Sequence, residues 1–338
     1  MNARKTTLKF IAKKANVSIA TVSRVLNGSE NVNEYTKDKV NRIIESDGYH
    51  KKIKIDKKII SVVIPDITNP FFASIIEGIE ITANLYGYHI VLSQYRENRD
   101  ILDRYFKEIN SIGISGYIII PAIGNTEYFN DIIKKSNVPI IFLDRKVDIE
   151  NVNYVGSDNE EGAYNATKYL TDLGHKKIIY MAGPKNISTE KERFSGFITA
   201  LNENDIDFDM KKYYKIANFN FDESYKQMKE IIKSKLEYTA IFSACDIMCF
   251  GIKKAAEECG MSIPEDISLI GYDDIPFSSI IGLTTVSSQV YEMGKNAVLA
   301  LLNIITERTK ENINQNRNIK PLIFYQTNYK IKCFVYFK

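Results

Sequence analysis

From residue 59 onward, short apolar runs alternate with longer amphipathic stretches, and this alternation limits the fold more than any other feature of the sequence. Each run is brief and rich in isoleucine, as in strands that are buried on both faces of a sheet. Strands that alternate with helices predict parallel, doubly wound sheets. The runs are numerous enough for two α/β lobes. The expected strands are 59–65, 89–93, 117–121, 138–143, 177–181, 240–242 and 267–271.

The first 49 residues carry a different pattern, in which apolar positions are spaced as in three short helices. Thr7 and Ser18 are suited to cap the first two helices, and Asn33 is suited to cap the third. Asn16 tolerates the left-handed conformation that a tight turn requires, and Gly48 would end the third helix. Two short helices joined by a turn of about three to four residues are typical of a helix-turn-helix DNA reader. The spacing alone also allows a three-helix bundle that binds protein.

The charge of the chain is unevenly distributed. Residues 1–58 contain 14 Lys or Arg residues and six Asp or Glu residues, although the whole chain has a net charge of only +3. The rest of the chain is therefore net acidic. A basic head on an acidic body indicates that the head binds a polyanion. A solvated basic tail explains the same charge, so this observation does not decide between the two.

In a helix-turn-helix reader, the second helix enters the major groove with its N-terminal residues at the base edges. Ile19 and Ala20 would contact thymine methyl groups, and Arg24 would pair with a guanine edge. Thr21 and Asn27 would hydrogen-bond phosphates, which fix the register of the protein on the duplex. The full predicted DNA-binding set is Thr7, Ser18, Ile19, Ala20, Thr21, Ser23, Arg24 and Asn27.

The sequence carries no sign of export or of a membrane anchor. Residues 1–10 are polar and mixed, and no run approaches the ~20 apolar residues of a spanning helix. The four cysteines, at positions 245, 249, 259 and 333, do not form the pattern of a disulfide framework. We therefore expect a cytoplasmic protein with no membrane partner.

An enzyme on an α/β fold is the main alternative class. The sequence contains no Walker loop, no GxGxxG, no GxSxG and no HExxH. Its three histidines, His50, His89 and His175, are scattered. Cys245 and Cys249 share a helix face, but a metal site would need further ligands at matching spacing. We expect no catalytic activity, no metal and no cofactor.

One segment resembles a known family closely. Residues 17–28 read VS-x-x-TVSRVLNG, and together with residues 7–12 they resemble the headpiece of the lactose-repressor (LacI/GalR) family. The resemblance continues through most of the chain. It includes Val63-Ile64-Pro65-Asp66, Asn69-Pro70-Phe71-Phe72, Leu143-Asp144-Arg145, Gly174-His175, Ile263-Pro264-Glu265-Asp266, Gly271-Tyr272-Asp273-Asp274 and Tyr291-Glu292-Met293-Gly294.

The resemblance implies a repressor of carbohydrate-utilisation genes that binds a double-stranded DNA operator as a homodimer. It also implies a core like the periplasmic sugar-binding proteins, with two lobes crossed by three strands. The expected domains are a helix-turn-helix domain at 1–49, a shortened hinge at 50–58 and an effector-binding, dimerising core at 59–338. Within this core, lobe 1 is expected at 59–160 and 290–320, and lobe 2 at 161–289 and 321–338.

The ligand in such a core lies in the cleft, where the strands of parallel sheets end. The expected ligand is a sugar or a sugar phosphate, because aromatic faces suit its ring and Asp and Arg suit its hydroxyl groups. One alternative is a core that responds to a partner protein of the phosphocarrier type. Another is an exported sugar-binding protein, which the basic head argues against. The predicted effector-binding residues are Asn69, Phe71, Phe72, Arg145, Thr189, Arg193, Phe219, Asp246 and Asp273.

This chain departs from the family pattern at several places. Phe10 stands where an Asp would complete the capping box of the first helix. Residues 50–58 lack the usual Ala-Arg-x-Leu hinge helix, whose leucine wedges into the minor groove. We expect a smaller operator bend and weaker allosteric coupling, unless Ile53 or Ile55 replaces the wedge. In the pocket, Cys245 stands where Asn is frequent, and Ser288 stands where Gln is usual.

Overall fold

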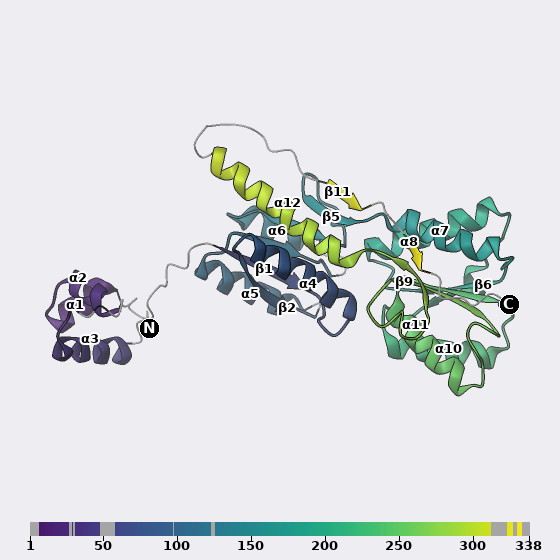
Figure 1. The fold of residues 1–338 in the computed structure, drawn as a ribbon, viewed down its shortest axis with the longest axis horizontal. Coiled ribbons are helices and arrows are strands. Elements are labelled where there is room, and N and C mark those ends of the chain that lie inside the picture. The colour runs from purple at the N-terminus through teal and green to yellow at the C-terminus, as the bar shows by residue number, and fades with distance from the viewer. Residues whose placement is uncertain are drawn as a thin grey trace. The chain divides into compact units, whose positions relative to one another are not determined.

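The computed structural model describes residues 7–26, 29, 31–47, 58–96, 98–122, 126–311, 323–326 and 330–332. The chain divides into two compact units, Met1–Asp56 and Lys57–Lys338 (Figure 1). Most of the predicted hinge at 50–58, together with Asn27 and Gly48, lies outside the described residues. Among the described helices, none has the length and apolar character needed to cross a membrane.

The first unit is a three-helix domain whose helices begin and end where the capping residues predict. Thr7 accepts a hydrogen bond from the third amide of the first helix, and Ser18 accepts one from the amide of Thr21 at 3.0 Å. Asn33 accepts one from the start of the third helix at 2.8 Å. Asn16 adopts a φ of 55°, as the tight turn requires. The helices are α1 (Leu8–Ala15), α2 (Ile19–Leu26) and α3 (Glu34–Ser46).

A small apolar core holds the three helices together. Ile11, Ala15, Val22 and Val40 are fully buried, and these residues come from all three helices. The predicted stripe on the second helix faces this core, because Val25 and Leu26 pack against it alongside Val22. The core contacts only the inner face of α2, so the outer face of this helix remains available for contacts.

The first lobe of the second unit is a parallel sheet with helices on both faces. Its strands run in the order β11-β5-β4-β3-β1-β2, and all neighbours are parallel. One face is covered by α4 and α12. These two helices pack so closely that a Cβ at Gly78 would lie 2.1 Å from the Tyr291 carbonyl oxygen, so the approach requires glycine there. The elements are β1 (Ile59–Ile64), α4 (Pro70–Leu85), β2 (His89–Gln94), α5 (Arg99–Ile112), β3 (Gly116–Ile119), α6 (Thr126–Lys135), β4 (Ile140–Leu143), β5 (Asn153–Ser157), α12 (Val290–Glu311) and β11 (Ile323–Gln326).

The second lobe repeats this architecture. Its strand order is β12-β10-β9-β8-β6-β7, and only β12 is antiparallel to its neighbour. The pairs α7–α8 and α10–α11 pack closely. The elements are α7 (Asn159–Asp172), β6 (Ile178–Ala182), α8 (Ser188–Glu203), α9 (Met210–Tyr213), β7 (Tyr214–Ile216), α10 (Phe221–Ser234), β8 (Ala240–Ser243), α11 (Asp246–Glu258), β9 (Ser268–Asp273), β10 (Thr284–Ser287) and β12 (Lys330–Lys332).

The chain crosses between the lobes three times, after β5, after β10 and after β11. These crossings confirm the predicted two-lobed, doubly wound core, and all seven predicted strands are present. One boundary was wrong. The tail at 321–338 was assigned wholly to lobe 2, but β11 pairs with β5 in lobe 1, with Ile323 opposite Tyr154. The pairing with β11 covers an edge of β5 that would otherwise be open. Because β5 and β11 lie far apart in the chain, the sequence of the tail alone does not reveal this pairing.

The start of α1 generates a stability prediction. Phe10 is 44% exposed at the third helical position, and the first turn contains no acidic residue. Phe10→Glu would complete a capping box with Thr7 and place a negative charge at the positive end of the helix dipole. We expect the head unit to gain about 0.5–1 kcal/mol, measured by hydrogen exchange of the α1 amides. Phe10→Ala is the control, and equal gains in both variants would contradict the capping explanation.

Candidate functional site

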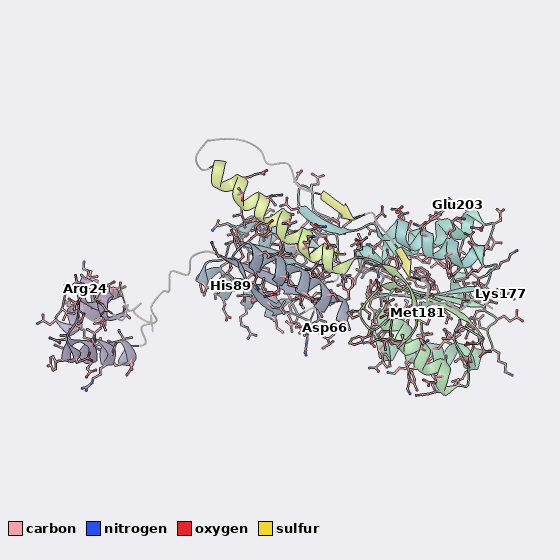
Figure 2. All side chains as sticks on the ribbon, viewed as in Figure 1. Arg24, Asp66, His89, Lys177, Met181 and Glu203 are labelled. Carbon is pink, nitrogen blue, oxygen red and sulfur yellow. The ribbon has the colours of Figure 1, made fainter. Side chains whose placement is uncertain are left out.

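The outward face of α2 carries the predicted base-reading residues. Ile19 is 48% exposed, Ala20 and Arg24 are also exposed, and Val22 between them is buried. Figure 2 labels Arg24 on this unit. Ser23 is half-buried. The outward face of α2 therefore presents a short apolar surface and one guanidinium, as a helix that enters the major groove of DNA would.

Three of the predicted DNA-binding residues, Thr7, Ser18 and Thr21, are hydrogen-bonded within the head. Thr7 and Ser18 cap α1 and α2, and the Ser18 hydroxyl lies 2.9 Å from the hydroxyl of Thr21. Their first role is therefore to hold the helix ends. Asn27 lies outside the described residues.

In the second unit, eight of the nine predicted effector residues surround one cavity between the lobes. The lobe 1 residues follow β1 and β4, and the lobe 2 residues come from α8 and from the ends of strands. Strand ends of parallel sheets are where ligands are expected to bind. The lining residues are Asn69, Phe71, Phe72, Asp144, Arg145, Thr189, Arg193, Phe219, Cys245 and Asp273.

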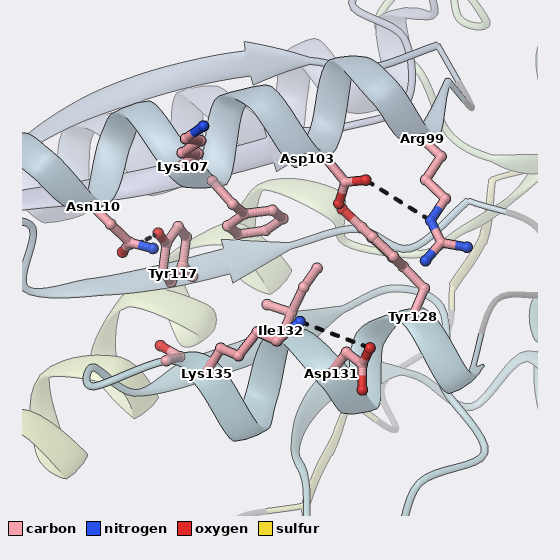
Figure 3. A pocket seen from close by; sticks show the side chains of 11 residues that line it. Arg99, Asp103, Lys107, Asn110, Tyr117, Tyr128, Asp131, Ile132 and Lys135 are labelled. Atoms are coloured by element: carbon pink, nitrogen blue, oxygen red, sulfur yellow. Dashed lines mark hydrogen bonds and ion pairs between the residues drawn. The ribbon is translucent and has the colours of Figure 1, made fainter. Parts of the chain in front are cut away.

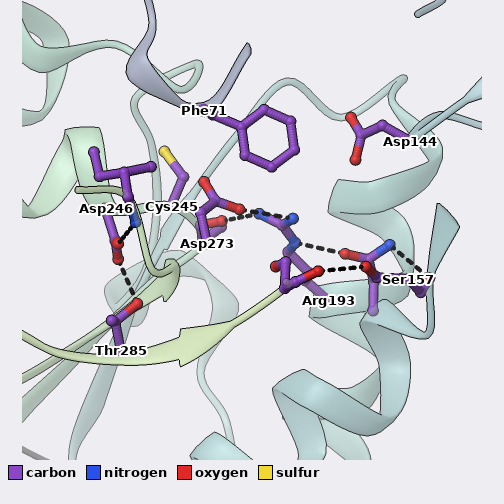
Figure 4. A network of polar contacts seen from close by, with 12 residues as sticks. Phe71, Asp144, Ser157, Arg193, Cys245, Asp246, Asp273 and Thr285 are labelled. Carbon is purple, nitrogen blue, oxygen red and sulfur yellow. Dashed lines mark hydrogen bonds and ion pairs between the residues drawn. The ribbon is translucent and has the colours of Figure 1, made fainter. Parts of the chain in front are cut away.

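Arg193 of α8 is the centre of a polar network in lobe 2 (Figure 4). Its Nη2 lies 3.1 Å from Oδ1 of Asp273, and its Nε donates to Oδ1 of Asn159 at 2.9 Å. Its Nη1 donates to the carbonyl oxygen of Ala244. The guanidinium stacks over the ring of Tyr272, with 3.9 Å between its carbon and the ring centroid. This buried cation is therefore held in one orientation at the floor of the cavity.

Arg145 occupies the corresponding place in lobe 1, directly after β4. Its Nε lies 3.6 Å from Oδ2 of Asp144, and its Nη1 donates to the carbonyl oxygen of Pro121 at 3.1 Å. The guanidinium lies 5.8 Å from the ring centroid of Phe72. Each lobe thus presents one buried arginine with one carboxylate to the cavity, so the two pairs balance in charge.

Aromatic rings supply the apolar side of the cavity. Phe71 and Phe72, at the start of α4, contact each other edge to face with centroids 5.3 Å apart. Phe219 has a φ of 55°, and its ring passes so close to Gly183 that a Cβ there would lie 2.2 Å from it. The space left among the lining residues is only about 20 Å³. That space holds about one water molecule, so a larger ligand requires the lobes to separate.

Burial sets the protonation of the acidic groups that face this cavity. Burial raises the pKa of Asp273 well above its usual range, and the Arg193 guanidinium opposes that shift. Burial likewise raises the pKa of Asp144, against the opposing effect of Arg145. The pKa of the Cys245 thiol is raised by burial too, which keeps the thiol neutral. Both carboxyls therefore carry a desolvation cost that hydroxyl donors of a ligand would reduce.

Asp246, the ninth predicted effector residue, does not line the cavity. Its carboxylate lies inside lobe 2, where it accepts hydrogen bonds from the hydroxyls of Ser278 and Thr285 at 2.6 Å each. It also accepts one from the amide of Ile275 at 3.0 Å. The prediction of a ligand contact was wrong here, because three donors far along the chain turn the side chain away from the cleft.

Sequence reasoning left out two residues that shape the site. Asn159 orients Arg193, and Tyr272 supplies the ring beneath it. A signal for Asn159 existed in the sequence, since the polar run 157–159 follows a short apolar run, but β5 was not predicted. Tyr272 lies in the family-like motif at 271–274, but its stacking on Arg193 could not be predicted because it depends on how β9 and α8 pack.

A separate cavity of about 360 Å³ lies on the outer face of lobe 1, between α5 and α6 (Figure 3). Its rim carries two ion pairs at 3.9 Å, Arg99–Asp103 and Lys135–Asp131, each between residues one helical turn apart. Both pairs are exposed and therefore weak. This cavity does not adjoin the predicted effector residues, so the interlobe cavity is the better candidate site.

The buried position of Asp246 generates a pH prediction. Burial raises its pKa to about 7, against the opposing hydrogen bonds, whereas an unfolded chain releases this proton near pH ~3.9. The native state therefore binds a proton that the unfolded state has lost, and the free energy of unfolding falls as pH rises between these values. Burial also raises the pKa of Glu190 to about 7, which adds to the slope.

We expect Asp246→Asn to flatten this slope by up to about 1.4 kcal/mol per pH unit, measured by urea unfolding at several pH values. Asp222→Asn, at an exposed position on α10, is the matched control and should leave the slope unchanged. A wild-type stability that rises over this pH window would contradict the assignment.

Comparison with known proteins agrees with this geometry. Residues 7–52 match the model of the bacterial regulatory proteins of the lacI family. Residues 57–328 match the model of periplasmic binding proteins and the sugar-binding domain of the LacI family. The chain is 30% identical to the ribose operon repressor of Halalkalibacterium halodurans, covering 90% of this chain and 91% of that protein.

Two further relatives extend the comparison. The chain is 31% identical to the transcriptional repressor CytR of Escherichia coli, covering 88% of this chain and 89% of the relative. A solved LacI family regulator from Enterococcus faecium, with bound ribose, superposes with a TM-score of 0.70 at 28% identity, covering 81% of this chain and 97% of that one. These matches confirm the expectation of a regulator rather than an enzyme. The chain belongs to the LacI family of DNA-binding bacterial transcriptional regulators.

Proposed function

We propose that this protein represses carbohydrate-utilisation genes and that a small sugar, bound between its two lobes, controls its affinity for DNA. The observation that carries this proposal is the interlobe cavity lined by eight residues predicted from the sequence. Two arginine–carboxylate pairs and three phenylalanines surround it. Planar charged groups bind vicinal hydroxyls, and aromatic faces suit the apolar face of a sugar ring.

Relatives support a sugar as the ligand class. One similar protein is named a ribose operon repressor, and one similar structure contains bound ribose. The alternative, a core that responds to a partner protein, leaves the interlobe cavity without a role. Titration with monosaccharides distinguishes the two, since only the sugar hypothesis requires a ligand in the cleft.

The proposal includes a homodimer on a double-stranded operator, in the cytoplasm. One recognition helix reads too few base pairs for specificity in a genome, so two copies are needed. An apolar surface suited to a second copy is present at the end of α4, where Ile81, Leu85 and the C-cap residue Tyr86 are exposed, with Leu85 at 79%. Exposed apolar patches of this kind mark interaction surfaces.

Arg145 provides the test of the ligand site. Arg145→Ala would remove the guanidinium of lobe 1 and abolish effector binding, while the fold and the basal DNA affinity remain. In a thermal-shift screen of monosaccharides, a ligand at 100 times its dissociation constant stabilises the wild type by ~2.7 kcal/mol, and the variant should lose this stabilisation. Arg99→Ala, in the same lobe but outside the cleft, is the control. Wild-type ligand affinity in Arg145→Ala would refute the site.

Arg24 provides the test of the DNA interface. Arg24→Ala should relax the sequence preference and cost ~1–3 kcal/mol on the operator, because a bidentate contact with a guanine edge is lost. The measurement is competitive binding to operator and random DNA. Arg42→Ala, an exposed arginine on α3, is the matched control. Equal losses on operator and random DNA would reassign Arg24 to a phosphate contact.

A further inference from the structure

Two contacts of Lys146 join the lobes beside the interlobe cavity. This residue follows β4 in lobe 1, and its Nζ lies 2.5 Å from Oε1 of Glu192 on α8 in lobe 2. Its backbone amide donates a hydrogen bond to the hydroxyl of Ser188, at the start of the same helix, at 2.8 Å. Because these partners belong to the other lobe, Lys146 can make both contacts only when the lobes are closed.

The ion pair between Lys146 and Glu192 is partly shielded from water. The side chain of Lys146 is 36% exposed and that of Glu192 is 20% exposed. The Lys146 ammonium also lies 5.7 Å from the ring centroid of Tyr154 on β5, which holds it against lobe 1. A fully exposed ion pair contributes little to stability, and partial burial strengthens it, although salt still screens it. The pair therefore favours the closed arrangement, and a high salt concentration should weaken it.

Glu192 is also connected to the buried cation at the floor of the cavity. Its Oε2 accepts a hydrogen bond from Nδ2 of Asn159 at 3.1 Å. Oδ1 of the same Asn159 accepts one from Nε of Arg193 at 2.9 Å. Asn159 is only 1% exposed, and both ends of its amide have partners, so its orientation serves Glu192 and Arg193 together. An unbroken series of polar contacts thus runs from Lys146 in lobe 1 to Arg193 in lobe 2.

We propose that Glu192 and Asn159 are positioning residues, which couple closure of the lobes to the orientation of Arg193. Closure brings Lys146 onto Glu192, and Glu192 holds the amide that orients the guanidinium. None of these three, Lys146, Glu192 and Asn159, lines the cavity, so they act on a ligand through Arg193. We call the three residues the interlobe relay. The consequence for ligand affinity rests on the proposed sugar-binding function.

The first experiment uses the Lys146 amide of the full-length protein, without ligand, as a reporter of closure. Its acceptor is on the other lobe, so its hydrogen exchange measures how often the lobes open. Ser188→Ala removes the acceptor and provides the rate of the unprotected amide. Glu192→Gln removes the charge but keeps an oxygen for Asn159. We expect this variant to exchange about two- to fivefold faster than the wild type, as the loss of a partly exposed ion pair predicts.

Salt separates an ionic contact from a general loss of packing. High salt should speed exchange in the wild type by a similar factor and have no effect in Glu192→Gln, because the ion pair is already lost. Glu237→Gln is the matched control, since Glu237 pairs with Lys177 within lobe 2. This control should leave the exchange of the Lys146 amide unchanged, and circular dichroism checks the fold of every variant.

The link between Glu192 and Asn159 is tested by a double-mutant cycle. Asn159→Asp keeps the oxygen that accepts from Arg193 but replaces the donor to Glu192 with a second carboxylate oxygen. We expect exchange of the Lys146 amide to become at least about twofold faster, because the two carboxylates repel each other. The same substitution should add nothing in Glu192→Gln, where the ion pair is lost and the Gln amide can donate to the new carboxylate.

The consequence for the ligand is measured by isothermal titration with ribose and with glucose. Glu192→Gln should weaken the binding of a sugar about two- to fivefold, and Glu237→Gln should not. Unchanged exchange in Glu192→Gln, or effects of the two substitutions that simply add, would overturn the inference and leave the sugar-binding function standing. If exchange behaves as expected but no monosaccharide of the thermal-shift screen binds, the proposed function is wrong and the relay stands.

Discussion

The structure of the proposed effector site depends on one buried cation, Arg193. A guanidinium out of water is tolerated only when its donors are paired, and here the partners come from three separate parts of lobe 2. Asn159 starts α7, Ala244 follows β8, and Tyr272 and Asp273 end β9. Pairing therefore joins these elements at one point and fixes the floor of the cleft. A ligand meets a site that is already oriented on this side.

The cleft is closed in this structure. The lobes touch through the hydrogen bond from Lys146 to Ser188 and through Ser157, whose hydroxyl donates to the carbonyl oxygen of Ser288 at 3.2 Å. A sugar cannot enter the remaining space of about 20 Å³ unless these contacts open. Ligand entry is thus coupled to a change between the lobes, and a ligand can shift that equilibrium only by binding one arrangement better. In the proposed function, this coupling is the physical basis for control of DNA binding.

Much of the fold could be predicted because it depends on local patterns. Apolar runs marked seven strands, and caps such as Thr7 and Asn33 marked the helix starts. The pairing of β11 with β5 could not be predicted, since it joins residues far apart in sequence. Resemblance to the family gave eight cavity residues, but it misplaced Asp246, whose side-chain direction depends on distant donors. The local sequence therefore predicts helices and strands, whereas hydrogen bonds between distant residues determine where a side chain such as Asp246 points.

The proposed function depends on coupling between the cleft and DNA binding. The most direct measurement is a fluorescence-anisotropy titration of the full-length protein on its operator, with and without a saturating sugar or sugar phosphate that binds the cleft. We expect the ligand to change the dissociation constant for the operator measurably but by less than about fivefold, below the lower end of typical allosteric coupling, because the hinge lacks the usual leucine wedge. An unchanged operator affinity at full occupancy of the cleft would contradict it.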